Sequence, residues 1–147
     1  MCLLYQDPSA MNKFTGYKVV FVSKDGKRYS PATGLCYDSY RGKDLPVKPR
    51  SKRLSNYFLD VLDPNQVGGW KRGMQGKSAV FRSFYDADSL YRKICSRGEN
   101  LKTHLRLTIV RATVSKDLRE GWYDDAEVVA GQRIRLSRRE EPIQEEI

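Results

Sequence analysis

The sequence predicts an α+β fold, with a largely antiparallel, mixed sheet and one main helix at about residues 86–97. Several short segments are rich in β-branched and aromatic residues or alternate between apolar and polar side chains, which is typical of strands. One segment instead repeats its apolar residues with the period of a helix. The order of hairpin, long excursion, strand, helix, strand and strand places the helix on one face of the sheet.

The first predicted element is a hairpin. Residues 17–23 (YKVVFVS) favour a strand, and residues 27–30 (KRYS) form the returning strand until Pro31 limits further pairing. Between them, Asp25-Gly26 suits the two positive-φ positions of a type I′ turn. Residues 19–22 are apolar at every position, so both faces of this strand should be buried and the strand should be central in the sheet.

The stretch 31–53 lacks periodicity and contains glycines and prolines, so we expect an extended excursion. Its second part, 41–53, holds six basic residues and one acid. A second short helix is predicted at about residues 54–62, because Leu54, Phe58 and Val61 fall on one face. This helix should end at Asp63, since the residue before a proline is pushed out of helical geometry.

The main helix follows a predicted strand at 79–84 (AVFRSF). Asp86 is a suitable N-cap and Gly98 a suitable C′ residue. Between them, the apolar face of the helix is formed by residues at spacings i, i+3, i+4, i+7 and i+8, namely Ala87, Leu90, Tyr91, Ile94 and Cys95.

Two further strand regions complete the sheet. Residues 104–109 alternate, and the apolar residues of 110–114 then fall on the other parity, which indicates a bulge or burial on both sides. Residues 126–129 and 132–136 form one or two strands, with Ile134 and Leu136 facing one side. The four carboxylates within 120–127 are interpreted as a solvated turn. The predicted core comprises Val19, Phe21, Phe81, Leu90, Ile94, Leu107, Ile109 and Leu136.

The length of 147 residues predicts a single domain. We expect a mobile leader at 1–15, a basic α+β domain at 16–139 and an acidic tail at 140–147. Three cysteines without CxxC spacing argue against a disulfide framework or a structural zinc site and favour a reducing, intracellular setting. The first residues have no basic n-region and no long apolar h-region, so no signal peptide is expected. No apolar run approaches the roughly 18 residues of a membrane span, so no membrane partner is expected.

The net charge is +9, and it is unevenly distributed. The last eight residues hold four glutamates and no basic residue, so residues 1–139 carry +13. Such a field attracts polyanionic partners, either nucleic acid or an acidic protein surface. The alternative is that the charge only keeps the protein soluble.

Residues 76–78, GKS, match the end of a phosphate-binding loop, but the rest of that motif is missing. Lys71 stands where the first glycine should be, and the residues after Ser78 favour a strand instead of the helix whose amides would face the phosphates. We therefore interpret this stretch as a basic loop with Trp70 among cations, which suits a single-stranded nucleic acid or an acidic protein, unless the tryptophan packs on the core. The predicted binding residues are Lys48, Arg50, Lys52, Arg53, Trp70, Lys71, Arg72 and Lys77.

The stretches GYKVV, DGKRYSP, FRSFYDADSLY and AEVVAGQRIRLSR give the chain a resemblance to small uncharacterised domains encoded by bacteriophages and large DNA viruses. The resemblance covers roughly residues 16–137. It implies a viral or phage-encoded protein that acts inside the host cell, in cytoplasm or nucleus.

The layout also resembles the ADP-ribosyltransferase fold at a distance. This resemblance implies a basic residue on the first strand, a serine on a later strand and a glutamate near the end, here Lys18, Ser83 and Glu127. Lys18 replaces the arginine or histidine of that pattern, so the implied domain is either active or degenerate.

The sequence as a whole favours a non-enzymatic binding protein, with no catalytic residue, no metal site and no cofactor. It would engage nucleic acid or a nucleic-acid-handling host protein through its basic surface. Two alternatives stay open, an ADP-ribosyltransferase-like domain and an inhibitor that fits an acidic groove of a host defence protein.

Overall fold

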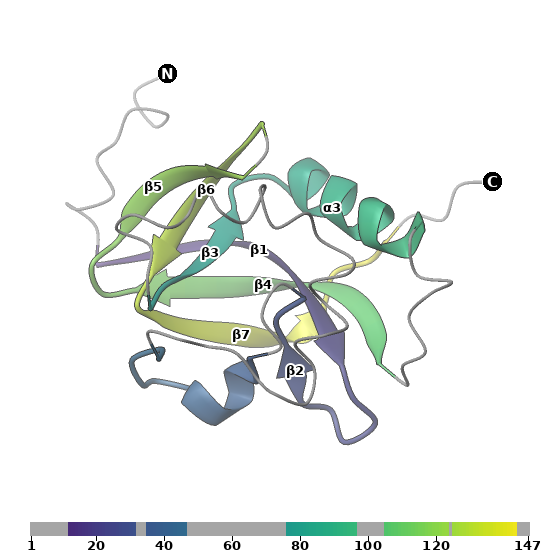
Figure 1. Cartoon of the computed structure of the whole chain (residues 1–147), viewed down its shortest axis with the longest axis horizontal. Coiled ribbons are helices and arrows are strands. Elements are labelled where there is room, and N and C mark those ends of the chain that lie inside the picture. The colour runs from purple at the N-terminus through teal and green to yellow at the C-terminus, as the bar shows by residue number, and fades with distance from the viewer. Residues whose placement is uncertain (1–11, 32–34, 47–75, 97–104, 124, 144–147) are drawn as a thin grey trace.

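A computed structural model describes residues 12–31, 35–46, 76–96, 105–123 and 125–143 (Figure 1). It confirms the α+β class, with one α-helix and an antiparallel seven-stranded sheet in the described residues. The strands are β1 (Lys13–Val22), β2 (Arg28–Tyr29), β3 (Ser78–Phe81), β4 (Arg106–Ser115), β5 (Arg119–Tyr123), β6 (Ala126–Gly131) and β7 (Arg133–Glu140). The helices are α3 (Phe84–Ser96) and the short 3-10 helix η3 (Tyr37–Tyr40).

The strand order β5-β6-β3-β1-β4-β7 confirms that β1 is central. β4 pairs along the whole length of β1, while the other edge of β1 is shared by β3 and β2. Along β1, Val19 and Phe21 are buried on one face and Val20 and Val22 on the other. The continuous apolar run in the sequence therefore reflects a strand covered on both sides.

The sheet is strongly curled. β6 and β7 are joined by Gln132 alone, yet β3, β1 and β4 lie between them in the strand order. Neighbouring strands lie roughly 4.8 Å apart, so in a flat sheet β6 and β7 would be about 19 Å apart, farther than one residue can span. The curl brings the end of β6 onto the end of β4, where a Cβ on Gly131 would lie 2.7 Å from the carbonyl oxygen of Ser115.

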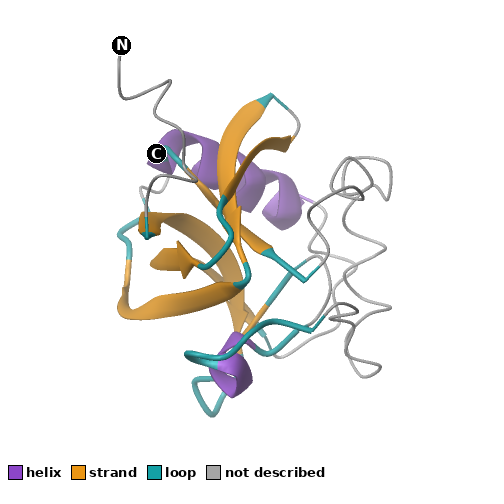
Figure 2. Cartoon of the chain, turned by 90° about the vertical axis from the view of Figure 1, so that its left-hand side faces the viewer, coloured by secondary structure: helices purple, strands orange, loops and turns teal. Residues whose placement is uncertain are grey.

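The core has two parts because each face of the curled sheet is covered by a different element. On the convex side, α3 packs its Ala87 and Ile94 against Val19, Phe81 and other residues of β1, β3, β4 and β6. Inside the curl, the apolar residues of β1, β3, β4, β6 and β7 meet Leu35, Tyr37 and Leu45 from the segment around η3. Figure 2 shows α3 and η3 at opposite ends of the sheet.

The predicted core residues are found in both clusters. Six of them are buried, and Leu90 and Leu107 are partly buried against the α3 cluster. Leu136 lies in the other cluster, inside the curl. Cys95, predicted on the apolar face of the helix, is exposed instead.

Three local expectations need correction. Asp25 has no positive φ, whereas Gly26 has φ 85°, so the hairpin loop is a type I turn followed by a left-handed glycine instead of a type I′ turn. The amide of Gly26 donates to the carbonyl of Ser23 at 2.9 Å, as a type I turn requires. α3 begins two residues before Asp86, and the Ser83 hydroxyl accepts the Asp86 amide at 3.2 Å, so Ser83 is the N-cap.

The third correction concerns residues 120–127. They were expected in a solvated turn, but β5 and the start of β6 form a hairpin there, with Trp122 opposite Glu127. Two of its carboxylates are used within the fold, because Glu120 and Glu127 both pair with Arg82 of the segment between β3 and α3. An internal ion-pair partner explains why so acidic a stretch can form two strands.

The remaining boundaries differ slightly from the expected ones. β1 begins at Lys13 and β7 ends at Glu140, so the sheet includes three residues of the expected leader and the first residue of the expected tail. The apolar residues change parity along 106–115 because β4 is buried on both faces. β4 also shifts its register against β7 between Val110 and Ala112. The predicted helix at 54–62 and Gly98 lie outside the described residues.

Candidate anion-binding pocket

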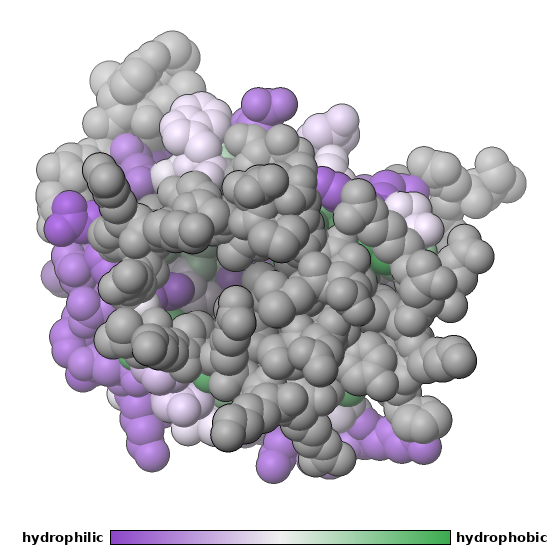
Figure 3. Space-filling model, in the orientation of Figure 1, coloured by the Kyte–Doolittle hydropathy of each residue, from purple (hydrophilic) through white to green (hydrophobic). Residues whose placement is uncertain are grey.

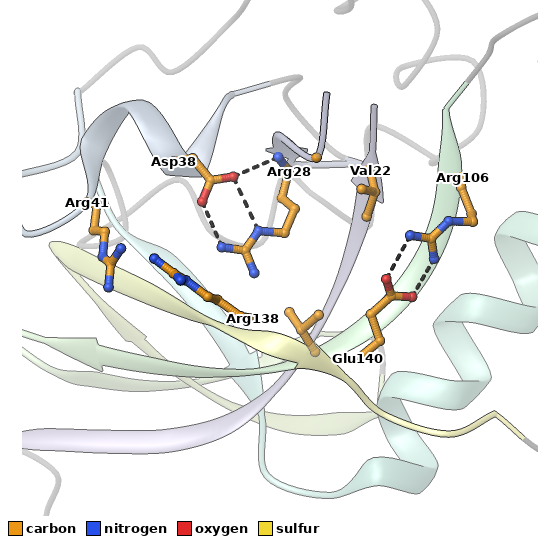
Figure 4. Close-up of a pocket in the computed structure, with 9 residues that line it drawn as sticks. Val22, Arg28, Asp38, Arg41, Arg106, Arg138 and Glu140 are labelled. Atoms are coloured by element: carbon orange, nitrogen blue, oxygen red, sulfur yellow. Dashed lines mark hydrogen bonds and ion pairs between the residues drawn. The ribbon is translucent and has the colours of Figure 1, made fainter. Parts of the chain in front are cut away.

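A pocket of about 420 Å³ opens at the end of the curled sheet where η3 and the β1–β2 hairpin meet β4 and β7 (Figure 4). Four of the residues around it are arginines, and two are carboxylates. Val22 and Val110 supply its apolar part. The lining residues are Val22, Gly26, Arg28, Asp38, Arg41, Arg106, Val110, Arg138 and Glu140.

Arg28 and Asp38 form a rigid wall of this pocket. The guanidinium donates through Nη2 to Oδ1 of Asp38 at 2.7 Å and through Nε to Oδ2 at 3.2 Å. The backbone amide of Arg28 donates to the same Oδ2 at 2.8 Å, and its Nη1 reaches the carbonyl of Ser137 in β7. Bidentate pairs of this kind fix the planes of both groups. Asp38 therefore holds η3 onto β2, and Arg28 ties both to β7.

Arg106 and Glu140 form a second bidentate pair. The Nη1 and Nη2 groups of Arg106 donate to the two carboxylate oxygens of Glu140, with an Nη2–Oε2 distance of 2.7 Å. The buried hydroxyl of Thr108 also donates to Glu140 at 2.8 Å. Figure 4 shows this pair at one end of the pocket and Arg41 and Arg138 toward the other end.

Arg41 and Arg138 differ from these two arginines because neither side chain forms a hydrogen bond or an ion pair with any residue that the structure describes. Arg41 directly follows η3, and Arg138 lies near the end of β7. Both residues are exposed. Two guanidinium groups thus face the pocket with their donors available.

Both carboxylates of the pocket are ionised at neutral pH. Hydrogen bonds from Arg106 hold the pKa of Glu140 below its ordinary value despite partial burial. Burial acts to raise the pKa of Asp38, but the hydrogen bonds from Arg28 and the charge of Arg41 together outweigh it, so this pKa is also lowered. Four arginines and two carboxylates leave the lining with a net charge of +2.

Unpaired cations also concentrate in the chain segments that border the pocket. Most described acids are used in ion pairs elsewhere, for example Asp44 with Lys116 and Arg133. In the β1–β2 hairpin, the stretch after η3 and the end of β7, six basic side chains have no hydrogen-bond or ion-pair partner among the described residues. They are Lys24, Lys27, Arg41, Lys43, Arg138 and Arg139. In Figure 3, hydrophilic side chains stand at the lower left and the lower right of the view, near where Figure 1 places η3 and this hairpin.

Most of the binding residues predicted from the sequence lie outside the described part of the chain, namely Lys48, Arg50, Lys52, Arg53, Trp70, Lys71 and Arg72. Lys77 is described, and its ammonium pairs with Asp117 at 2.9 Å. Its side chain is only 4% exposed. β3 follows Lys77 directly, which confirms that no helix N-terminus follows the GKS letters.

The pocket arginines, in contrast, were not predicted individually. Arg28, Arg106 and Arg138 stand on three strands that are far apart in the sequence, and only the sheet brings them together. One signal was present, because Arg41 begins the basic stretch 41–53 that the sequence favoured as a binding region. A strand arginine by itself gives no indication of which face or which end of the sheet it will occupy.

The three residues implied by the ADP-ribosyltransferase resemblance take part in separate local interactions. Ser83 caps α3. The Lys18 ammonium donates to the carbonyl of Ala79 at 2.6 Å and lies 5.3 Å from the centre of the Tyr37 ring. Glu127 pairs with Arg82 at 3.4 Å. Within the described ranges, no hydrogen bond or ion pair joins any two of the three.

Within the described residues, no cluster of histidine, cysteine, aspartate or glutamate could hold a metal ion. No helix in that part of the chain is both long enough and apolar enough to span a membrane. Comparisons with models of protein families, with curated proteins and with solved structures gave no match to this chain.

Proposed function

We propose that this protein is a non-enzymatic binding protein that engages nucleic acid through a basic surface centred on the arginine pocket. The observation that carries the proposal is the pair Arg41 and Arg138, whose guanidinium groups line the pocket without a partner among the described residues. Arginine offers several donors in a planar fork that matches the oxygens of a phosphate. The basic residues in the neighbouring segments extend the field in which a polyanion would be held.

The fixed arginines support the same function in a different way. Asp38 and Glu140 hold Arg28 and Arg106 in place, so these side chains lose little further freedom when a ligand binds. Their guanidinium groups still contribute positive charge to the pocket walls. A preorganised wall beside two available cations is suited to electrostatic binding of a phosphate backbone.

The proposal is tested by titrating the protein with a single-stranded oligonucleotide at two salt concentrations. The double variant Arg41→Gln/Arg138→Gln should bind more weakly by about tenfold or more, and the slope of log affinity against log salt should flatten by about one unit for each arginine. Arg135→Gln is a matched control, because Arg135 is also exposed and lies on β7, facing the side opposite to the buried Leu136.

The control variant removes the same kind of charge from outside the pocket, so it should lower affinity much less than either pocket substitution. Equal losses for Arg135→Gln and Arg138→Gln would show that only the net charge matters and would contradict a pocket-centred surface. No binding by the wild-type protein at low salt would remove the nucleic-acid proposal and leave an acidic protein surface as the partner to test.

A further inference from the structure

The pocket that carries the proposed function is a hollow lined by charged side chains and not a flat basic surface. A sugar–phosphate backbone can be followed by scattered lysines and arginines on an open face. Here, four arginines line a single pocket of about 420 Å³. That volume falls within the range of small-molecule sites, so it has room for a phosphate with an attached sugar or nucleoside.

The distribution of charge in the pocket also limits the ligand. Asp38 and Glu140 each neutralise one arginine through a bidentate pair. This leaves two positive charges without a counter-charge in the lining, on Arg41 and Arg138. An internal phosphodiester of a nucleic acid carries one negative charge, whereas a phosphomonoester carries close to two at neutral pH. The monoester therefore matches the uncompensated charge of the pocket.

The walls of the pocket supply suitable contacts for both parts of such a ligand. The oxygens of a phosphomonoester can accept from two arginine forks at once, which a diester with only two unbridged oxygens does less well. Val22 and Val110 give an apolar surface for the sugar or base, and guanidinium planes can stack on a base. Asp38 and Glu140 are each paired with an arginine, so they repel the bound anion less than unpaired carboxylates would.

We infer that the pocket binds a phosphomonoester of a nucleotide, with Arg41 and Arg138 as its direct ligands and Val22 and Val110 beside the nucleoside. This inference rests on the proposed function, because it specifies which phosphate of a nucleic acid the basic surface recognises. The same chemistry occurs at the phosphorylated end of a strand and in a free mononucleotide, and the experiment separates these two sources.

The test compares one short single-stranded oligonucleotide with a 5′-phosphate, the same strand with a 5′-hydroxyl, and adenosine 5′-monophosphate as a competitor. The phosphorylated strand should bind about tenfold more tightly than the hydroxyl strand, since the extra charge-assisted hydrogen bonds are worth at least one such factor. If the pocket recognises the phosphomonoester alone, adenosine 5′-monophosphate should displace the phosphorylated strand. If only an unlabelled phosphorylated strand displaces it, the pocket recognises the phosphorylated end of a strand and not a free mononucleotide.

The preference for the 5′-phosphate should disappear in Arg41→Gln and in Arg138→Gln, whereas Arg135→Gln should keep it. The preference should also shrink between about pH 7 and pH 5, because the second ionisation of a phosphomonoester lies near pH 6. The titratable groups that line the pocket, Asp38 and Glu140, have lowered pKa values and stay ionised over that range. Thermal melts of all variants show whether each one is folded, and exposed Arg41 and Arg138 should tolerate substitution.

The outcomes distinguish this inference from the proposed function. Equal binding of the two strands by the wild-type protein would overturn the phosphomonoester site and leave nucleic-acid binding intact. A preference that survives the loss of both Arg41 and Arg138 would place the phosphate somewhere else and would also overturn the inference. No binding of either strand at low salt would contradict the proposed function itself.

Discussion

Glu140 accepts hydrogen bonds from Arg106 with both carboxylate oxygens, and this pair connects the last residue of β7 to the first residue of β4. The same carboxylate accepts the buried Thr108 hydroxyl. Immediately afterwards, the amide of Glu141 donates to the carbonyl of Ile109 at 2.8 Å, and Ile143 packs against the α3 cluster. The beginning of the acidic stretch 140–147 is therefore integrated into the fold.

A chain that ends at Arg139 should consequently be less stable than the chain of 147 residues. It loses the Glu140 and Glu141 contacts and the apolar contact of Ile143, which together contribute on the order of 2–4 kcal/mol. A chain that ends at Ile143 keeps all of these contacts and is the matched control. Urea unfolding of both chains checks the prediction, and equal midpoints would show that these residues do not stabilise the fold.

The contact of Glu140 also predicts a specific pH dependence. Hydrogen bonds from Arg106 lower the pKa of Glu140 in the folded protein below its ordinary value of 4.5. The ionised carboxylate therefore stabilises the fold fully above pH 4.5, and this stabilisation is lost as the pH falls through the pKa of the folded protein. The difference in unfolding free energy between wild type and Glu140→Gln should therefore be constant from about pH 7 to pH 5 and should shrink in more acidic solution. A difference that stays the same down to pH 3 would contradict this assignment.

Lys77 should act mainly on stability. Its side chain is nearly buried and its ammonium pairs with Asp117, which also lowers the pKa of that carboxyl. Lys77→Ala removes this contact and should lower the melting temperature only modestly, because Asp117 is half exposed and solvent screens the pair. Polyanion affinity should fall no more than in the Arg135→Gln control. A loss of binding as large as that of Arg138→Gln, without a change in the melting temperature, would show that Lys77 belongs to the binding surface.

Gly131 should be intolerant of a side chain. A Cβ at this position would lie 2.7 Å from the Ser115 carbonyl oxygen and 2.9 Å from the Ser115 nitrogen, and backbone atoms in a sheet cannot move aside. Gly131→Ala should therefore destabilise the protein by about 1–3 kcal/mol. Gly26→Ala is a useful comparison, because Gly26 has open space around it and the cost there is only that of a positive φ. Thermal unfolding of the two variants checks the order, which would be wrong if Gly131→Ala were the milder change.

Local pattern was sufficient to predict much of the fold from the sequence. Continuous apolar residues at 19–22 predicted a strand buried on both faces, and the helical period at 87–94 predicted α3, because strand and helix periodicities are set by backbone geometry within a few residues. The α+β class follows from the order of these elements. The excess of basic residues, from which a polyanionic partner was predicted, also follows from the composition alone.

Only the tertiary structure decided how the sheet closes and where the pocket arginines meet. The single residue between β6 and β7 forces the curl, but this becomes evident only once their partners β3 and β4 are known. Asp25 was predicted to share the positive φ that Gly26 alone adopts in the hairpin. Asp86 was predicted as the N-cap of α3 in place of Ser83, because several polar residues near a helix start satisfy the same local rule. The pocket joins residues 28, 41, 106 and 138, and no short-range pattern connects positions so far apart. Their convergence is a product of long-range strand pairing, which local sequence does not encode.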